Sequence, residues 1–335
     1  MIDSEIREIS RNLGSISYED STILITGGAG FLGSWICDSL IQQNAQVICL
    51  DNLSSGRLEN ISHLLDNDHF RFIEHDISIP VDLDEKLDFI FHLASRASPF
   101  EFEKFPLDIL KSNTYGTLNS LELAKRSNAI MLFTSTSEVY GDAHIVPTPE
   151  SYQGNVNPVG IRGCYDEAKR VGEAFCMAYV RQFNCDVRIA RIFNTYGPRM
   201  RSDGYYGRVI PRFIQQANNG DPITIFGDGK QTRSFCYITD QVEGLFRLAG
   251  TDNLKGEIVN IGNPEEVTIL QLAHNIIVET NSKSPTIFQE LPPDDPKRRC
   301  PVIEKARDLL EWHPKISLKD GLRRTIYSFN DKHKH

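Results

Sequence analysis

Two residues of the segment CYDEAKR could together remove a proton from a hydroxyl group. Tyr165 and Lys169 stand four positions apart, and on a helix such residues share one face. A nearby ammonium favours the phenolate form, so we expect Lys169 to lower the pKa of Tyr165 and make it a base near neutral pH. The Y-x-x-x-K spacing arises readily by chance, so its weight depends on the residues around it.

Polar side chains follow a predicted strand at residues 130–135. The strand ends in a run of four hydroxyl residues and a carboxylate, Thr134-Ser135-Thr136-Ser137-Glu138. Ligands of parallel α/β sheets bind at the carboxyl ends of the strands. A hydroxyl of this run could therefore hold a substrate hydroxyl beside Tyr165.

A glycine-rich turn indicates a phosphate site. Gly27, Gly30 and Gly33 follow a short apolar strand at 22–26 and precede apolar residues at helical intervals. The first glycine permits the tight turn, the second lets a pyrophosphate approach the backbone, and the third lets the helix pack close to the strand. The helix N-terminus adds N–H groups and a positive dipole end, so we expect dinucleotide contacts at Gly27, Gly30, Phe31 and Leu32. The alternative is a plain βα turn in an unrelated α/β protein.

An acidic residue favours the dinucleotide interpretation. Twenty-four residues after Gly27, the apolar run Val47–Leu50 ends in Asp51. A carboxylate at this place can bind the adenosine ribose hydroxyls and would repel a 2′-phosphate. The expected cofactor is therefore NAD rather than NADP.

Strand and helix patterns alternate from Thr22 to about Thr195. The predicted strands cover 22–26, 46–50, 71–75, 88–93, 130–135 and 186–193. This alternation predicts an α/β fold with a doubly wound parallel Rossmann sheet. The residues that follow the strands should contact the cofactor together with Tyr165 and Lys169, and they include Asp51, Asn52, Asp76, Ile77 and Leu93.

The chain divides into two predicted domains and an extension. Residues 1–20 should form an N-terminal helical extension, because Ile6, Ile9 and Leu13 recur at helical spacing. Residues 21–196 should form the NAD-binding domain, to which 234–263 return. Residues 197–233 and 264–330 should form a smaller C-terminal substrate domain, with irregular segments at Ser202–Tyr206 and Pro292–Pro296.

Composition excludes several classes of protein. Of the 335 residues 40% are hydrophobic and 24% charged, and the net charge of −9 argues against nucleic-acid or anionic-membrane binding. We expect no membrane span, because no apolar run reaches about 18 residues, and no signal peptide at the acidic start MIDSEIREIS. Seven scattered cysteines without a C-x-x-C pair favour reduced thiols in the cytoplasm. The histidine spacing predicts no metal site.

Basic residues concentrate between positions 197 and 233. This segment holds six basic and three acidic residues, a net charge of +3 within an acidic chain. Arg298 and Arg299 add a second basic pair. Arginine forks match phosphate and carboxylate oxygens, so the segment could bind a polyanionic substrate. A solvated basic face is the equal alternative.

The chain resembles the extended short-chain dehydrogenase/reductase family over about residues 20–330. Within it, the closest likeness is to the UDP-glucuronate decarboxylases, also called UDP-xylose synthases. The resemblance rests on long runs: HLASRASP (92–99), TSTSEVYGD (134–142), GNVNPVGIRGCYDEAKR (154–170), RIARIFNTYGPRM (188–200), GDGKQTRSF (227–235), NIGNPEE (260–266) and DDPKRR (294–299).

The resemblance implies roles in an oxidation, a decarboxylation and a reduction. Thr136, Tyr165 and Lys169 are similar to the family's catalytic residues for oxidation of the sugar 4-hydroxyl by NAD. Carbon dioxide would then leave from the 4-keto sugar, and reduction would give UDP-xylose. The residues similar to those assigned to decarboxylation and protonation are Ser137, Glu138 and Arg233. The residues similar to binders of the UDP-sugar are Asn194, Arg208, Arg233 and Arg299, and the alternative for each is structural pairing at the domain junction.

The pair Ser137-Glu138 separates related reactions. Nucleotide-sugar 4,6-dehydratases of this family carry Thr-Asp-Glu here, and the aspartic acid ejects the hydroxyl of position 6. Ser137 is no useful acid near neutral pH. The family's epimerases usually have small or uncharged residues where Glu138 stands, which argues against epimerisation.

Three departures from the decarboxylase pattern bear on the substrate. Arg96 replaces a proline or cysteine, Phe102 stands where tyrosine is frequent, and Tyr205-Tyr206 enlarges the loop before Arg208. The open alternatives are a UDP-glucuronate 4-epimerase, a synthase that releases a 4-keto sugar, and a non-enzymatic NAD-binding scaffold. The resemblance also implies a homodimer formed through helices at about 106–126 and 165–183.

Overall fold

The structure is a computed structural model that describes residues 1–201, 208–291 and 298–332. The predicted irregular segments at 202–206 and 292–296, and with them Tyr205-Tyr206, lie outside the described residues.

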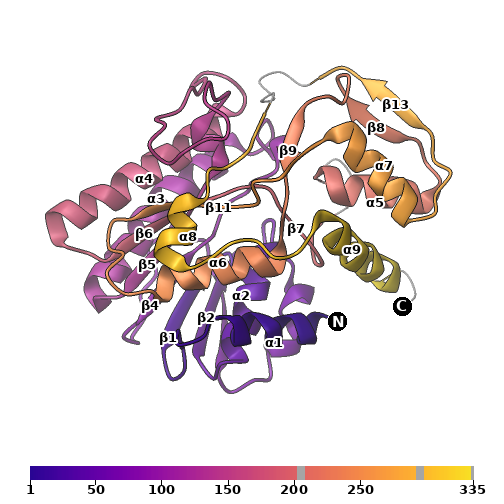
Figure 1. The fold of residues 1–335 in the computed structure, drawn as a ribbon. Helices are drawn as coiled ribbons and strands as arrows, with labels where there is room; N and C mark the ends of the chain where they lie inside the picture. The colour runs from indigo at the N-terminus through magenta and orange to yellow at the C-terminus, as the bar shows by residue number, and fades with distance from the viewer. Residues whose placement is uncertain (202–207, 292–297, 333–335) are drawn as a thin grey trace.

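A parallel sheet of seven strands forms the centre of the described chain (Figure 1). Its order is β11–β6–β5–β4–β1–β2–β3, so the direction of winding reverses between β1 and β4. The strands are β1 (Thr22–Thr26), β2 (Gln46–Asp51), β3 (Phe70–Glu74), β4 (Phe89–His92), β5 (Ile130–Thr136), β6 (Val187–Ile192) and β11 (Ile258–Ile261). The six predicted strands are correct to within one residue at either end, and the doubly wound parallel sheet is confirmed.

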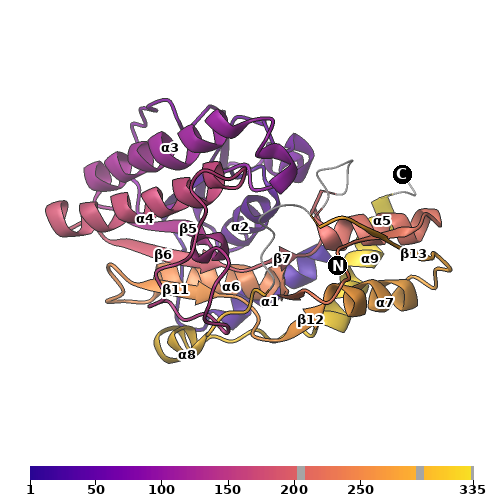
Figure 2. The ribbon, with the colours of Figure 1, turned by 90° about the horizontal axis from the view of Figure 1, so that it is seen from above.

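Helices cover both faces of this sheet (Figure 2). On one face α3 (Pro106–Ser127) and α4 (Gly163–Phe183) pack side by side against β4, β5 and β6. On the other face lie α2 (Phe31–Ile41) and α6 (Ile238–Gly250). The strands are buried on both sides and their sequences are accordingly almost continuously apolar, as in Ile23, Leu24 and Ile25.

The first helix, α1 (Ile2–Asn12), packs against α2 and α6. Ile6, Ile9 and Leu13, which recur at helical spacing, are buried in the main core. A buried carboxylate adds polar contacts, because Glu5 accepts hydrogen bonds from the Tyr237 hydroxyl at 3.0 Å and from Arg324 at 2.9 Å. The first residues are therefore part of the folded body.

A second group of elements stands beyond the carboxyl ends of the sheet, at the right of Figure 1. It consists of α5 (Val209–Asn219), β8 (Ile223–Phe226), α7 (Ile269–Glu279), β13 (Thr286–Gln289) and α9 (Leu318–Lys332). Here β13 pairs with β8 in parallel. Short pairs between the two groups are β12 (Glu266–Thr268) with β9 (Thr232–Ser234) and β10 (Cys236–Tyr237) with β7 (Thr195–Tyr196). The remaining elements are α8 (Glu304–Leu310) and the 3-10 turns η1 (Leu58–Asn60), η2 (Ser62–Leu64), η3 (Pro99–Glu101) and η4 (Ser137–Tyr140).

Among the described residues, no helix is both long enough and apolar enough to cross a membrane. All seven cysteines are free thiols, and all but Cys164 are buried.

Candidate active site

One cavity of about 1070 Å³ opens at the carboxyl ends of the strands and extends to the second group of elements. Its lining includes every residue that the sequence predicted for a site. These are Gly27, Gly30, Phe31, Leu32, Asp51, Asn52, Asp76, Ile77, Leu93, Thr136, Ser137, Glu138, Tyr165, Lys169, Asn194, Arg208, Arg233 and Arg299.

The glycine-rich turn has the shape that a pyrophosphate requires. Gly27 has a positive φ of 73°, and a side chain at Gly33 would meet the Gly27 carbonyl oxygen at 2.2 Å. At Gly30, by contrast, the nearest atom to an added side chain lies 3.1 Å away. Gly30 is the N-cap of α2, and since it has no side chain, it covers none of the first-turn N–H groups. The turn therefore excludes a side chain at Gly33 and crowds one at Gly30, and the absence of side chains there leaves the backbone N–H groups uncovered for a phosphate.

Asp51 ties the end of β2 to this turn. Its Oδ2 accepts the N–H of Ala29 at 3.0 Å, and its Oδ1 accepts the N–H of Leu53 at 2.8 Å. Burial raises the pKa of the carboxyl more than these two hydrogen bonds lower it. Each oxygen keeps a second lone pair, so the carboxylate can still accept a hydrogen bond from a ligand hydroxyl. The neighbouring strand ends are joined as well, because Asn52 donates to Asp76 at 3.0 Å.

Tyr165 and Lys169 are both buried on α4, but the expected effect of the lysine on the tyrosine is wrong. Burial raises the pKa of Tyr165 to about 12, against the opposing charge of Arg208 and a hydrogen bond with Thr136. Lys169 instead donates to the carbonyl of Thr134 at 2.7 Å, and its ammonium lies 5.9 Å from the Tyr165 ring centroid. Burial also lowers the pKa of Lys169 to about 7. In this structure desolvation outweighs the helix spacing on which the expectation rested.

Two arginines hold the carboxylate of Glu138. Arg299 binds it with both terminal nitrogens, one of them at 2.6 Å from Oε2, and Arg162 binds the same Oε2. Burial raises the pKa of Glu138, but the charges of Arg299 and Arg162 outweigh it and lower the pKa to about 2. Glu138 is therefore ionised at neutral pH and can accept hydrogen bonds but not donate one.

Sequence reasoning missed Arg162 and Asp166. Asp166 lies one turn after Arg162 on α4, with 3.7 Å between its Oδ2 and the Arg162 Nε. Burial, reinforced by the charge of Glu138, raises the pKa of Asp166 to about 7. The available signal was the spacing: Arg162, Tyr165 and Asp166 are three and four positions apart, which places them on one helical face.

The side chains of the remaining predicted site residues donate hydrogen bonds to backbone carbonyls around the cavity. Arg233 is buried, and its Nη1 donates to the Thr232 carbonyl at 2.8 Å. Asn194 donates to the Ser234 carbonyl at 3.3 Å. Arg208 reaches across the cavity mouth and donates to the Ala97 carbonyl at 3.4 Å. Guanidinium and amide groups match the oxygens of an anion, so Arg233, Asn194 and Arg208 could bind an anionic ligand from this cavity.

The comparisons identify the family. The model of the "NAD dependent epimerase/dehydratase family" matches residues 23–262. The chain belongs to this family. It is 49% identical over 311 residues to UDP-glucuronic acid decarboxylase 1 of Arabidopsis thaliana, covering 92% of this chain and 70% of that protein. UDP-glucuronic acid decarboxylase 1 of Xenopus tropicalis is 46% identical over 313 residues, covering 93% and 73%.

A solved structure of the family has the same fold. The UDP-glucuronic acid 4-epimerase from Bacillus cereus, in complex with UDP-glucuronic acid and NAD, aligns with a TM-score of 0.83 at 31% identity. The alignment covers 93% of this chain and 99% of that chain. The cavity described above is thus the candidate active site of an epimerase/dehydratase family protein.

The loop between β4 and α3 carries two departures from the decarboxylase pattern. Arg96 pairs with the buried Glu101 at 2.6 Å, and its guanidinium lies 4.3 Å from the Phe105 ring centroid. Phe102 stacks on the Tyr165 ring, with 5.3 Å between centroids and 16° between planes. Phe102 therefore contacts the candidate catalytic tyrosine, and Arg96 lines the same cavity.

The basic residues predicted between 197 and 233 divide between the cavity and structural pairing. Three line the cavity: Arg208, Arg212 and Arg233. Arg199 instead pairs with Asp38 at 2.6 Å, and the exposed Lys230 lies 3.6 Å from Asp228. Part of the cluster thus faces the candidate site and part stabilises the surrounding structure.

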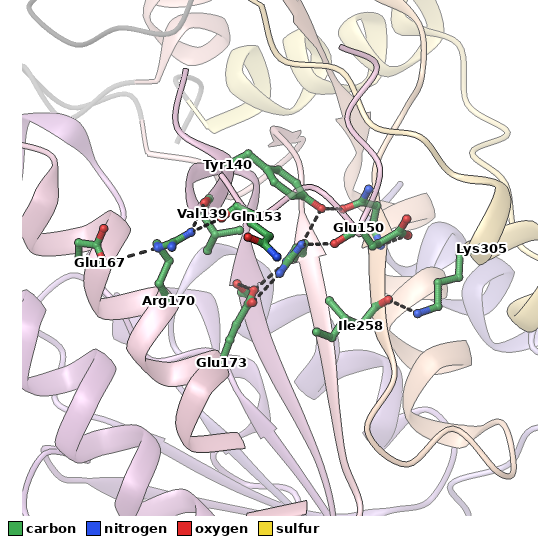
Figure 3. A network of polar contacts seen from close by, with 12 residues as sticks. Val139, Tyr140, Glu150, Gln153, Glu167, Arg170, Glu173, Ile258 and Lys305 are labelled. Atoms are coloured by element: carbon green, nitrogen blue, oxygen red, sulfur yellow. Dashed lines mark hydrogen bonds and ion pairs between the residues drawn. The ribbon is translucent and has the colours of Figure 1, made fainter. Parts of the chain in front are cut away.

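A polar network fixes the segment that follows β5 (Figure 3). Arg191 of β6 donates to the Tyr140 hydroxyl at 3.0 Å and pairs with Glu173 of α4 at 2.7 Å. Arg170, about one turn before Glu173 on α4, donates to the Val139 carbonyl at 3.0 Å. These contacts join η4 to β6 and α4, and so hold the strand end that carries Glu138.

Proposed function

We propose that this protein is an NAD-dependent UDP-glucuronate decarboxylase that forms UDP-xylose through a 4-keto intermediate. The observation that carries the proposal is the pair Ser137–Glu138 at the end of β5, with Glu138 ionised between Arg162 and Arg299. The similarity to the decarboxylases of Arabidopsis thaliana and Xenopus tropicalis supports it.

NAD is the proposed cofactor, and the glycine-rich turn and Asp51 fit it. The backbone of Gly27, Gly30, Phe31 and Leu32 would hold the pyrophosphate, and Asp51 would accept the ribose hydroxyls. The strand-end residues Asn52, Asp76, Ile77 and Leu93 would line the rest of the cofactor site. When bound, NAD takes a hydride from the sugar and later returns it.

Asp51 leads us to expect selectivity for NAD over NADP. Its carboxylate would repel a 2′-phosphate, so the purified protein should bind NAD much more tightly than NADP. Titration of both nucleotides by calorimetry measures the ratio. Comparable affinities would contradict the role of Asp51.

Oxidation at position 4 of the sugar is proposed for Tyr165, Thr136 and Lys169. Tyr165 would take the proton of the sugar 4-hydroxyl. The Thr136 hydroxyl, which forms a hydrogen bond with Tyr165, would orient the 4-hydroxyl. Because burial raises the pKa of Tyr165 to about 12, its phenolate needs a nearby positive charge. The charge of Arg208 already lowers this pKa, and Lys169, whose own pKa is about 7, would add to it only in its protonated form.

Decarboxylation is proposed for the residues after β5 and Arg233. A ketone at position 4 is β to the carboxylate at position 5, so the electrons of the departing carbon dioxide flow into that carbonyl. Arg233 would hold the substrate carboxylate or stabilise the enolate that remains. Glu138 and Ser137 would lie beside position 5 during decarboxylation. Since Glu138 is ionised, the proton that position 5 then takes up would come from solvent water, relayed through the Ser137 hydroxyl, and not from the Glu138 carboxyl. Ser137 lacks the acidity to eject a hydroxyl from position 6.

The UDP part of the substrate is assigned to Asn194, Arg208 and Arg299. They line the same cavity, and two of them carry the cationic forks that match diphosphate oxygens. A cavity of about 1070 Å³ is at the upper end of single-ligand sites, which suits a dinucleotide and a nucleotide sugar bound together. We assign this part of the cavity to a substrate domain of residues 197–233 and 264–330, beside an NAD-binding domain of 21–196 and 234–263.

Product analysis tests the proposed function. Incubation with UDP-glucuronate and NAD should release carbon dioxide and give UDP-xylose by NMR, and dTDP-glucose should not be dehydrated. UDP-galacturonate as sole product would establish a 4-epimerase instead. A 4-keto pentose accompanied by NADH would establish the ketone-releasing synthase, and absence of turnover would favour the scaffold.

The cytoplasm is the compartment we propose, because the free cysteines suit a reducing environment.

A further inference from the structure

Glu138 is held from two different parts of the chain. Arg299 comes from the segment that follows residue 297 and is 161 positions away, whereas Arg162 comes from the start of α4. Both arginine side chains are largely buried, and both line the cavity. An anionic substrate would therefore meet a carboxylate that already has two cationic partners.

The two arginines differ in what else surrounds them. Arg162 pairs with Asp166 on the next turn of α4, and its guanidinium lies 5.7 Å from the Phe102 ring centroid. It is thus held by the carboxyl group of Asp166 and by the Phe102 ring. Arg299, in the function proposed above, also serves the UDP part of the substrate and would share its donors with phosphate oxygens.

We propose that Arg162 is a positioning residue of the decarboxylation step, which holds the Glu138 carboxylate ionised and oriented while substrate is bound, and that Asp166 fixes Arg162. The proposal rests on the proposed function. It assigns to Arg162 no contact with the reacting atoms, so its effect must be exerted through Glu138.

The charges around Glu138 set the direction of the expected change. From α4 it faces Arg162, Tyr165 and Asp166, and from the C-terminal part it faces Arg299. Loss of Arg162 removes one of two cations that lower the pKa of Glu138 to about 2. The pKa must then rise toward its ordinary value. If turnover requires ionised Glu138, the acid limb of the pH profile rises with it.

The test compares R162Q, R162K and D166N with the wild type in carbon dioxide release from UDP-glucuronate between pH 4 and 9. For R162Q we expect kcat at pH 7 to fall by roughly a hundredfold, with a small change in KM. Its acid limb should rise into the measured range, whereas the wild-type limb, set by a Glu138 pKa of about 2, lies below pH 4. R162K keeps the charge but loses the fork, so the acid limb should return toward the wild type while kcat recovers in part.

Asp166 and Arg170 supply two comparisons on the same helix. D166N should lower kcat without moving the acid limb, because the pKa of Asp166 near 7 makes it neutral at acidic pH already. Arg170 contacts the backbone of η4 but not Glu138. R170Q should therefore keep the wild-type acid limb, even where a looser η4 lowers kcat.

The outcomes separate the inference from the proposed function. NAD binding, measured for each variant at each pH, identifies any loss of folding. A slow R162Q with a wild-type acid limb would reduce Arg162 to a structural role and overturn the inference. If R162Q fails to fold, R162K decides instead. An R162K enzyme with the wild-type kcat at every pH would also overturn the inference. A wild type that releases no carbon dioxide would overturn the proposed function before any variant is made.

Discussion

At the scale of single residues, burial decides the protonation states in the candidate site. Tyr165 and Lys169 have pKa values shifted toward their neutral forms, to about 12 and about 7. The pKa of Glu138 is shifted in favour of the charged form, because two guanidinium groups more than offset the desolvation of the carboxylate. One cavity thus combines a phenol that needs activation with a carboxylate that is permanently ionised near neutral pH.

Tyr165→Phe tests the base directly. The substitution removes the phenolic oxygen and keeps the ring that stacks on Phe102, so the fold should survive. We expect turnover of UDP-glucuronate to fall below roughly one part in a hundred. NAD affinity, measured by calorimetry, should stay within a few-fold of wild type. A Tyr165→Phe enzyme with the wild-type rate would contradict the assigned role.

The burial of His92 leads us to expect that the free energy of unfolding decreases in acid. It is fully buried at the end of β4, where its ring nitrogens contact Thr26 at 2.7 Å and Thr117 at 3.2 Å. Burial, aided by the charge of Lys169, lowers its pKa from 6.5 to about 3. Between these values the unfolded chain binds a proton that the folded chain does not. His92 therefore lowers stability as pH falls from 6.5 to 3, by up to about 1.4 kcal/mol per pH unit.

Urea unfolding at several pH values measures this effect. His92→Gln should be less stable than wild type at pH 7, because it loses buried hydrogen bonds. Its stability should nevertheless fall less steeply between pH 6.5 and pH 4. Parallel curves for the two proteins would exclude His92 as the source.

At the scale of elements, the strands followed from the sequence but the contacts of Glu138 did not. Uniformly apolar runs between turn residues are local features, and they located β1 to β6 to within one residue. The Glu138–Arg299 pair joins positions 161 apart, which no local pattern contains. Arg162 could have been found, since it lies three residues before Tyr165. The raised pKa of Tyr165 could not, because it depends on burial by distant segments.

The loop between β4 and α3 depends on the buried Arg96–Glu101 ion pair. Glu101→Gln would leave the Arg96 guanidinium, which is 14% exposed, without a charged partner. We expect a loss of roughly 3 kcal/mol in the free energy of unfolding. The matched control is Asp82→Asn, which breaks the exposed pair with Arg126. The loss in the free energy of unfolding for Asp82→Asn should stay below about 1 kcal/mol. Equal costs in urea unfolding would show that burial of the loop pair is unimportant.

At the scale of the whole molecule, the cavity requires both groups of elements. The sheet contributes its strand ends, with α4 beside them. The second group contributes Arg208 at the start of α5, and the segments between the two groups contribute Arg233 of β9 and Arg299. The helices α3 and α4 lie on the sheet face away from α6 (Figure 2). Residues of their first two turns line the site, among them Ser112 of α3 and Lys169 of α4. The outer surfaces of α3 and α4 remain for another partner, and this is where we place the interface of a homodimer.

Exposed apolar side chains on these helices support the homodimer. Leu107 and Tyr115 of α3 are 66% and 57% exposed, and Phe183 at the end of α4 is 43% exposed. A second copy that covers two helices with two of its own would bury them in a contact of standard size, about 1,600 Å².

We therefore expect sedimentation at micromolar concentration to give twice the mass of one chain. Tyr115→Asp would place a charge in this contact and should yield monomers. Tyr327→Asp on α9 is the control, since Tyr327 is 61% exposed away from α3 and α4, and it should leave the dimer intact. A wild type that sediments as a monomer, or dissociation by the Tyr327 substitution alone, would contradict this interface.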